Sequence, residues 1–211
     1  MTSTAALVDF ASALEAVEDW LTEYISASHP EIGRTGPICP FVAPSRKNRT
    51  MEIRMRLVGH APTLELLEEI AHSSLREYEL TTWQGRNPML RAMVVALPDL
   101  RSEDTGLLDQ VHARVKDAFV TRGLMIGQFH KNCEVTAARN PRFAVSKAPL
   151  PLFAIRAIAL HDAFFLSEKP HWFQHYRERF GKFFGPGSTV MDSLLIARYE
   201  EAERAYGGPP P

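Results

Sequence analysis

The segment Leu90-Arg91-Ala92-Met93-Val94-Val95-Ala96-Leu97 decides the fold class of this chain. Its Met93–Ala96 run is apolar at every position, whereas a strand with one solvated face alternates apolar and polar residues. Such a run is typical of a strand at the centre of a sheet whose two faces are both covered by helices. The segment therefore predicts an α/β protein.

The sequence on either side of this segment supports a mixed sheet with packed helices. Residues 51–57 alternate apolar and charged side chains, which predicts a strand with one buried face. Apolar residues recur at three- and four-residue intervals in three segments, which predicts helices over 5–26, 62–79 and 103–121. Further strands are predicted at 124–126 and 152–160, and two C-terminal helices at 170–184 and 189–205. A thioredoxin-like fold has this alternation, but the sequence does not determine the strand order.

The N-terminal helix shows the clearest stripe of large apolar residues. We expect its buried face to consist of Leu7, Phe10, Leu14, Val17, Leu21 and Tyr24. Two other segments, 31–50 and 131–151, carry several prolines and no periodicity, and we expect both to be long loops. Loops of this length in a compact domain often belong to functional sites.

Composition places the chain among ordinary globular proteins. It has 211 residues, 45% of them hydrophobic, and a formal net charge of -1. We expect one domain over residues 1–206 and a disordered tail over 207–211. The near-zero charge argues against nucleic acid or an anionic membrane as partner. With no secretory signal or spanning segment, and only Cys39 and Cys133 as thiols, a cytoplasmic protein without disulfides is expected.

The stretch Gly127-Gln128-Phe129-His130-Lys131-Asn132-Cys133 is the first candidate site, because it lies where a predicted strand gives way to a loop. His130 suits a haem axial ligand, a general base, or a histidine that is merely hydrogen-bonded beneath the loop. Cys133 follows three residues later and is a second possible metal ligand. Structural zinc is not expected, since such sites need four ligands and no nearby pair completes the set.

Three further features are candidates for chemistry. In Thr35-Gly36-Pro37-Ile38-Cys39-Pro40-Phe41, the cysteine before proline suits a haem ligand or a nucleophile, or it is a small buried side chain. Arg139 can anchor a carboxylate, or it is a surface arginine. His171 and His175 share a helical face at a spacing that can bind a metal, or they lie at the rim of an aromatic helix that packs on the sheet.

Several of these segments resemble the YqcI/YcgG family. They are Cys39-Pro40-Phe41, Ile126-Gly127-Gln128-Phe129-His130, Ala138-Arg139, Pro149-Leu150-Pro151-Leu152-Phe153-Ala154-Ile155 and Leu160-His161-Asp162-Ala163-Phe164-Phe165. That family includes haem-dependent N-hydroxylases of natural-product pathways. The chain is still more similar to an uncharacterised bacterial family that shares the CPF and GQFH segments near biosynthetic genes. Family members commonly have proline after the histidine, where this chain has Lys131.

The resemblance implies a haem b cofactor with His130 as the iron ligand and with Cys39, Phe41 and Arg139 in the pocket; Cys39 and Cys133 are the alternative ligands. We therefore expect a haem-dependent oxidoreductase that acts on a small amino-acid-like or nitrogen-containing substrate in natural-product biosynthesis. A noncatalytic haem or small-ligand binding protein and a thiol-redox protein are the alternatives. We expect a small-molecule substrate and no nucleic-acid or membrane partner. A homodimer is kept as one alternative for the oligomeric state.

Overall fold

The computed structural model describes residues 8–185, 187–188 and 190–208. These residues form two compact units, the first within Met1–Lys116 and Ile126–Arg156, the second within Asp117–Met125 and Ala157–Pro211. The single domain expected over 1–206 stays a prediction. Most of the tail expected at 207–211 lies outside the described residues.

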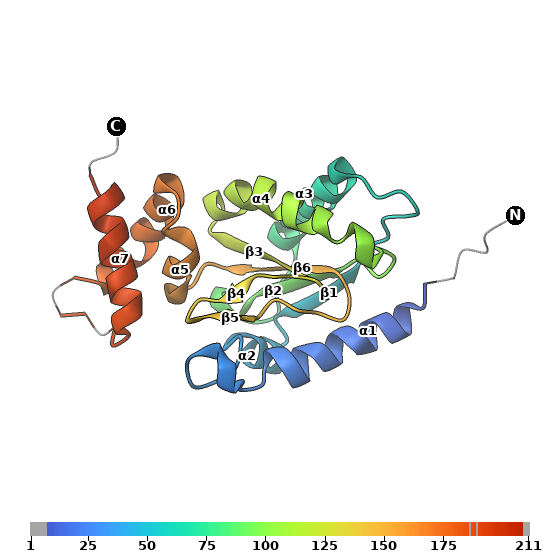
Figure 1. Cartoon of the computed structure of the whole chain (residues 1–211), viewed down its shortest axis with the longest axis horizontal. Coiled ribbons are helices and arrows are strands. Elements are labelled where there is room, and N and C mark those ends of the chain that lie inside the picture. Colours follow the sequence, from blue (N-terminus) through green and yellow to red (C-terminus); the bar gives the residue numbers. More distant parts are fainter. Residues whose placement is uncertain (1–7, 186, 189, 209–211) are drawn as a thin grey trace, which may run out of the picture. The chain divides into compact units, whose positions relative to one another are not determined.

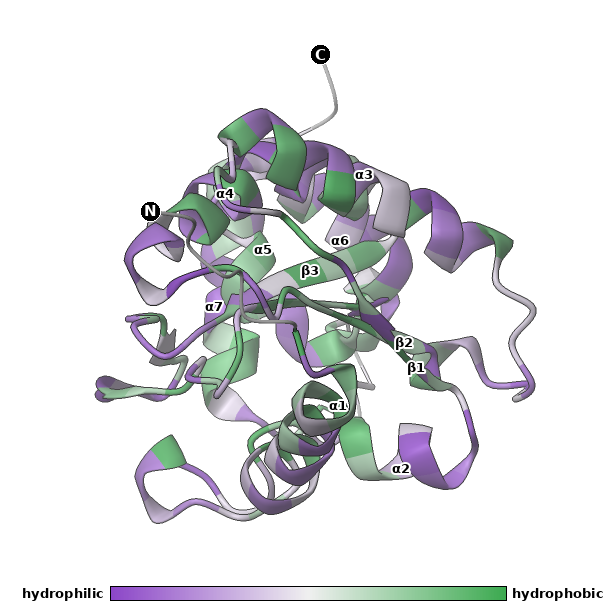
Figure 2. Cartoon of the chain, turned by 90° about the vertical axis from the view of Figure 1, so that its right-hand side faces the viewer, coloured by the Kyte–Doolittle hydropathy of each residue, from purple (hydrophilic) through white to green (hydrophobic). Residues whose placement is uncertain are grey.

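A four-stranded mixed sheet confirms the predicted α/β class. Its order is β1 (Met51–Met55), β2 (Ala92–Ala96), β6 (Leu152–Ala157) and β3 (Leu124–Phe129). Strand β1 runs parallel to β2, and β6 runs antiparallel to β2. In β2, Met93–Ala96 are all buried, as expected for an inner strand that is covered on both faces. Figure 2 shows β3 coloured largely hydrophobic, whereas α3 alternates between hydrophobic and hydrophilic along its length.

Helices cover both faces of this sheet. Figure 1 shows α3 (Leu64–Leu80) and α4 (Gly106–Thr121) on one side, and α1 (Phe10–Asp19) and α2 (Val42–Lys47) on the other. The second group encloses a core that we call the α1-side core. Its buried members are Val17, Trp20, Leu21, Ile25, Val42, Val94, Ala96, Ala148 and Leu152. No helix among the described residues combines the length and apolarity needed to cross a bilayer.

The predicted buried face of the N-terminal helix is confirmed only in part, and Leu7 lies outside the described residues. Val17 and Leu21 are buried as predicted, whereas Phe10 and Leu14 are exposed and Ala13 is buried. Leu14 and Ala13 lie three and four residues before Val17, and both spacings fit one face of a helix, so periodicity does not choose between them. The helix also ends in a π-helical turn, η1 (Trp20–Ile25), which a regular 3.6-residue pattern does not predict.

Both predicted loops contain regular structure. Within 31–50 lie the end of a 3₁₀ turn, η2 (Pro30–Ile32), and the helix α2, where Pro44 occupies the first turn and its missing N–H removes no helical hydrogen bond. Within 131–151 lie the paired strands β4 (Thr136–Ala137) and β5 (Asn140–Ala144). Pro141 is tolerated because this is a two-stranded ribbon, in which each strand is an edge.

The second unit contains the predicted C-terminal helices. They are α5 (Ala163–Leu166), which follows the 3₁₀ turn η5 (Leu160–Asp162), then α6 (Pro170–Phe180), which runs into η6 (Gly181–Phe183), and α7 (Ser193–Tyr206). Aromatic side chains of α6 and α7 pack together in its core, where the Phe173 and Tyr199 ring centroids are 5.3 Å apart. The aromatic residues of α6 therefore build this core together with α7.

Candidate functional site

The end of β3 directs neighbouring side chains to opposite faces of the sheet. The Phe129 ring packs edge-on against Trp20, with 5.3 Å between the ring centroids, in the α1-side core. Gln128 and His130 reach Asp109 on α4 instead. This is the alternation expected along a strand, and it carries one residue beyond the end of β3. His130 therefore lies on the α4 side of the sheet.

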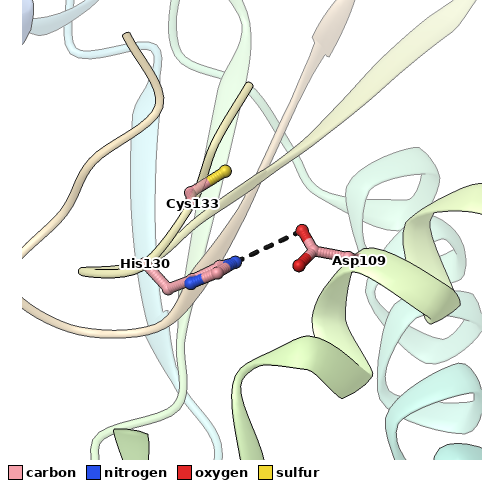
Figure 3. Close-up of side chains that lie close together, drawn as sticks. All are labelled: Asp109, His130 and Cys133. Atoms are coloured by element: carbon pink, nitrogen blue, oxygen red, sulfur yellow. Dashed lines mark hydrogen bonds and ion pairs between the residues drawn. The ribbon is translucent and has the colours of Figure 1, made fainter. Parts of the chain in front are cut away.

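Three potential metal ligands meet on this side. One ligand atom from each of Asp109, His130 and Cys133 lies within 4.8 Å of the other two, and Figure 3 shows the three side-chain ends facing one another. His130 Nε2 is 3.2 Å from Asp109 Oδ1. A tight turn brings Cys133 back, with its backbone N–H donating to the His130 carbonyl at 3.1 Å. We call these three residues the α4–β3 cluster.

Burial within the α4–β3 cluster is uneven. The His130 side chain is 2% exposed and Cys133 is fully buried, whereas the Asp109 side chain is 47% exposed. Gln128 Nε2 donates to Asp109 Oδ1 at 3.1 Å and fixes the carboxylate beside the imidazole. The cluster is thus closed on the sheet side and open to solvent at the carboxylate.

His130 has one unsatisfied ring nitrogen. Its Nε2 is engaged with Asp109, but its Nδ1 is buried and has no hydrogen-bond partner among the described residues. A buried polar atom without a partner costs roughly 1–3 kcal/mol of stability. The imidazole is therefore held by the described residues through Nε2 alone.

Burial also raises the pKa of the Cys133 thiol, and a hydrogen bond from the Val135 backbone opposes the shift only in part. The thiol form is favoured as long as no positive charge lies close to the sulfur. This is unlike reactive cysteines, whose thiolate is stabilised and accessible. The environment of Cys133 thus argues against a free nucleophile, and a thiolate at this position would need a positive charge close to the sulfur.

Comparison with known families places the α4–β3 cluster within a recognised domain. Residues 14–189 match the model of a domain of unknown function, DUF6875. The chain belongs to this family. No curated protein and no solved structure matches the chain. The thioredoxin-like element of the fold prediction therefore stays a prediction.

Other predicted site residues of the DUF6875 domain lie away from the α4–β3 cluster. Cys39 packs against the α1-side core, and its backbone N–H donates to the Ile25 carbonyl at 3.0 Å. Phe41 precedes α2, and the Arg156 guanidinium carbon lies 5.4 Å from its ring centroid. The structure thus brings Cys133 to His130, but it places Cys39 on the opposite face of the sheet.

Arg139 lies in the turn that joins β4 to β5. Its backbone comes so close to Gly33 that a Cβ added to this glycine would be 2.8 Å from Arg139 Cβ. Gly33 also has a φ of +79°, a conformation that glycine adopts without strain. The close approach gives this part of the hairpin a packing role against the segment after η2.

The histidine pair of α6 does not converge on one point. His171 Nε2 lies 3.3 Å from Asp117 Oδ1, whereas His175 Nδ1 lies 3.8 Å from Glu178 Oε2. The two imidazoles therefore face different carboxylates. This arrangement gives no support to a shared metal site at the pair.

A haem group does not fit the side chains as they are arranged. An iron ligand needs open space for a flat macrocycle above its nitrogen, but His130 is almost fully buried and its Nε2 faces Asp109. Cys39, another predicted pocket residue, packs on the opposite face of the sheet. The donor set of the α4–β3 cluster instead suits a single metal ion, because carboxylate, imidazole and thiolate are all common ligands of zinc.

Sequence reasoning missed Asp109. This residue follows Leu108 in a helix that was predicted from its apolar face, and nothing separates it from other acidic residues in the first turn of a helix. Its one distinguishing feature is contact with Gln128 and His130, which only the packing of α4 on the sheet provides.

A second histidine of the DUF6875 domain, His112, should make stability depend on pH. Its Nε2 lies 3.0 Å from the Ile126 carbonyl, and burial together with the positive charge of Lys116 lowers its pKa to about 4. The folded state thus binds this proton less well than the unfolded chain, whose histidine pKa is about 6.5. The contribution of the neutral His112 to the free energy of unfolding is complete above pH 6.5 and is lost as the pH falls towards 4. At pH 5 the free energy of unfolding is lower by about 2 kcal/mol.

Urea unfolding at pH 7.5 and pH 5.0 tests this, with His112→Gln as comparison because its amide can still donate to the Ile126 carbonyl. We expect the variant to lose about 2 kcal/mol less than the wild type between the two pH values. Equal losses in both proteins would contradict the prediction.

Proposed function

We propose that this DUF6875 protein binds one transition-metal ion, Zn²⁺ or Fe²⁺, through Asp109, His130 and Cys133, and acts on a small molecule at that ion. The observation that carries this proposal is the meeting of a carboxylate oxygen, an imidazole nitrogen and a sulfur within 4.8 Å. The three come from a helix, the end of a strand and the turn after it, so the fold holds them in place.

The spacing of the ligand atoms suits one ion. Zinc bonds nitrogen and oxygen at about 2.0 Å and sulfur at about 2.3 Å, so tetrahedral ligand atoms lie roughly 3.3–3.6 Å apart. The 3.2 Å between His130 Nε2 and Asp109 Oδ1 lies just below this range. Even the upper limit of 4.8 Å needs a closure of only about 1 Å, which side-chain rotation can supply.

The charges of the site also balance. A Cys133 thiolate and the Asp109 carboxylate contribute two negative charges beside a neutral imidazole, which together neutralise a divalent cation. The ion would compensate for the burial that otherwise disfavours the thiolate. Sulfur, nitrogen and oxygen together suit zinc and iron better than magnesium or calcium, which prefer oxygen ligands alone.

Metal analysis of the purified protein tests the proposal. We expect one equivalent of bound metal per wild-type chain, and at least about 100-fold weaker Zn²⁺ binding after His130→Ala, because a direct ligand is lost. His171→Ala is the matched control, since it removes a half-exposed imidazole from the second unit, and it should bind as the wild type does. A wild type that binds no metal, or a His130→Ala variant with unchanged affinity, would refute the proposal.

A second candidate is haem-dependent oxidation of a small amino-acid-like or nitrogen-containing substrate in natural-product biosynthesis. It is supported by the resemblance to the YqcI/YcgG family at Cys39-Pro40-Phe41 and at Gly127–His130. It requires His130 to leave Asp109 and the residues that bury it. Titration with hemin tests it: a Soret band that disappears in His130→Ala would support haem, and no Soret band in the wild type would exclude it.

The remaining alternatives are separable too. A noncatalytic binding protein would hold its metal or haem without substrate-dependent oxygen consumption. A thiol-redox protein has less support, because Cys133 is buried with a raised pKa and Cys39 lies across the sheet. A small-molecule substrate, a cytoplasmic location and a homodimer stay predictions.

A further inference from the structure

We propose that the metal ion in the α4–β3 cluster keeps one coordination position open to solvent, where water or a small monodentate anion binds. This inference rests on the proposed function and deepens it, because an open position separates a site for chemistry from a purely structural one. Structural zinc sites have four protein ligands, whereas catalytic sites have three and leave the fourth position to water or substrate.

The number of ligands is the first argument. Among residues 8–185, 187–188 and 190–208, the group that can hold an ion has three members, Asp109, His130 and Cys133. The nearby His112 is not a fourth ligand through Nε2, because this nitrogen is hydrogen-bonded to the Ile126 carbonyl. The Gln128 side-chain amide nitrogen is likewise committed to Asp109. The described side chains thus leave a tetrahedral ion one ligand short.

The uneven burial gives the direction of the open position. His130 and Cys133 close the cluster on the sheet side, while Asp109 is 47% exposed. The exposed carboxylate is therefore the side from which we expect a solvent molecule to approach the ion. The contacts of this carboxylate with Gln128 and His130 both use Oδ1. Asp109 Oδ2 has no hydrogen-bond partner among the described residues and is available to a water bound to the metal.

The charge of the α4–β3 cluster indicates which molecules can bind at the open coordination position. The cluster is neutral once a divalent ion is bound, so a neutral water and a small anion are both admissible. Water bound to zinc has a pKa far below that of bulk water, and Asp109 Oδ2 is suitably placed to accept one of its hydrogens. A water molecule or an anionic group of a substrate can thus bind next to the ion at this position.

Cobalt substitution tests the open position without an activity assay. The wild-type protein is loaded with Co²⁺, whose visible bands report coordination and whose near-ultraviolet band reports a thiolate ligand. Azide is then added at constant ionic strength. We expect a saturable shift of the visible bands while the thiolate band persists. Perchlorate, which coordinates weakly, is the control and should leave the spectrum unchanged.

The outcomes are distinct. A Co²⁺ complex that shows the thiolate band but does not respond to azide would mean that the protein fills every position, which overturns this inference and leaves the proposed function standing. Absence of the thiolate band in the Co²⁺-treated protein would overturn the proposed function and this inference with it. An identical response to azide and perchlorate would mean that the shift comes from ionic strength, which also overturns the open position.

Discussion

Replacing Cys133 with serine is expected to weaken Zn²⁺ binding by at least about 100-fold, whereas the same replacement at Cys39 should leave the affinity unchanged. A serine hydroxyl is a far poorer ligand than a thiolate, because it stays protonated at neutral pH. The two cysteines form a matched pair: Cys133 faces Asp109 and His130, and Cys39 packs against the α1-side core on the other side of the sheet. Competition with a chromophoric zinc chelator measures both affinities.

The fold must be checked independently, because Cys133 is fully buried. Circular dichroism of the metal-free proteins shows whether each variant is folded, and Cys133→Ala offers a variant that buries no new hydroxyl. Loss of affinity in both Cys133 variants with a retained fold is the expected result. Equal affinities of the Cys133 and Cys39 variants would show that the sulfur of the α4–β3 cluster is not a ligand.

Replacing Phe173 with alanine is expected to destabilise the second unit by about 3–5 kcal/mol. The ring is 1% exposed, and its centroid lies 5.3 Å from that of Tyr199 and 6.4 Å from that of Tyr176. Its removal takes away a large apolar surface and leaves a cavity that the neighbouring aromatic rings can fill only in part. Such a loss is a large fraction of the stability of a typical domain.

Urea unfolding followed by near-ultraviolet circular dichroism measures this effect, because that signal reports the packing of the aromatic rings. Phe183→Ala is the control, since this ring is 39% exposed and its removal should cost less than about 1 kcal/mol. A Phe173→Ala variant as stable as Phe183→Ala would show that the aromatic cluster does not stabilise the unit.

Much of the fold could be predicted because local patterns report burial directly. The unbroken apolar run from Met93 to Ala96 placed an inner strand, and the predicted face of α4 is buried at Leu108, Val111, Val115 and Phe119. The predictions failed where two patterns were equally good or where the elements were short. Leu14 and Ala13 lie three and four residues before Val17, and a helical stripe allows both spacings. A two-stranded ribbon containing Pro141 has too few residues for a periodicity.

The sequence by itself determined that His130 and Cys133 lie three residues apart, so that both can face one site only if the loop after the strand curls back. Only the tertiary structure decided which residues join them. Asp109, 21 residues before His130, reaches it because α4 packs on that face of the sheet. Cys39 was expected beside His130 and is not there, because strand alternation turns Phe129 towards the α1-side core and His130 away from it. A strand shows in its sequence that its side chains alternate, but the layers packed on its two faces decide what each side chain meets.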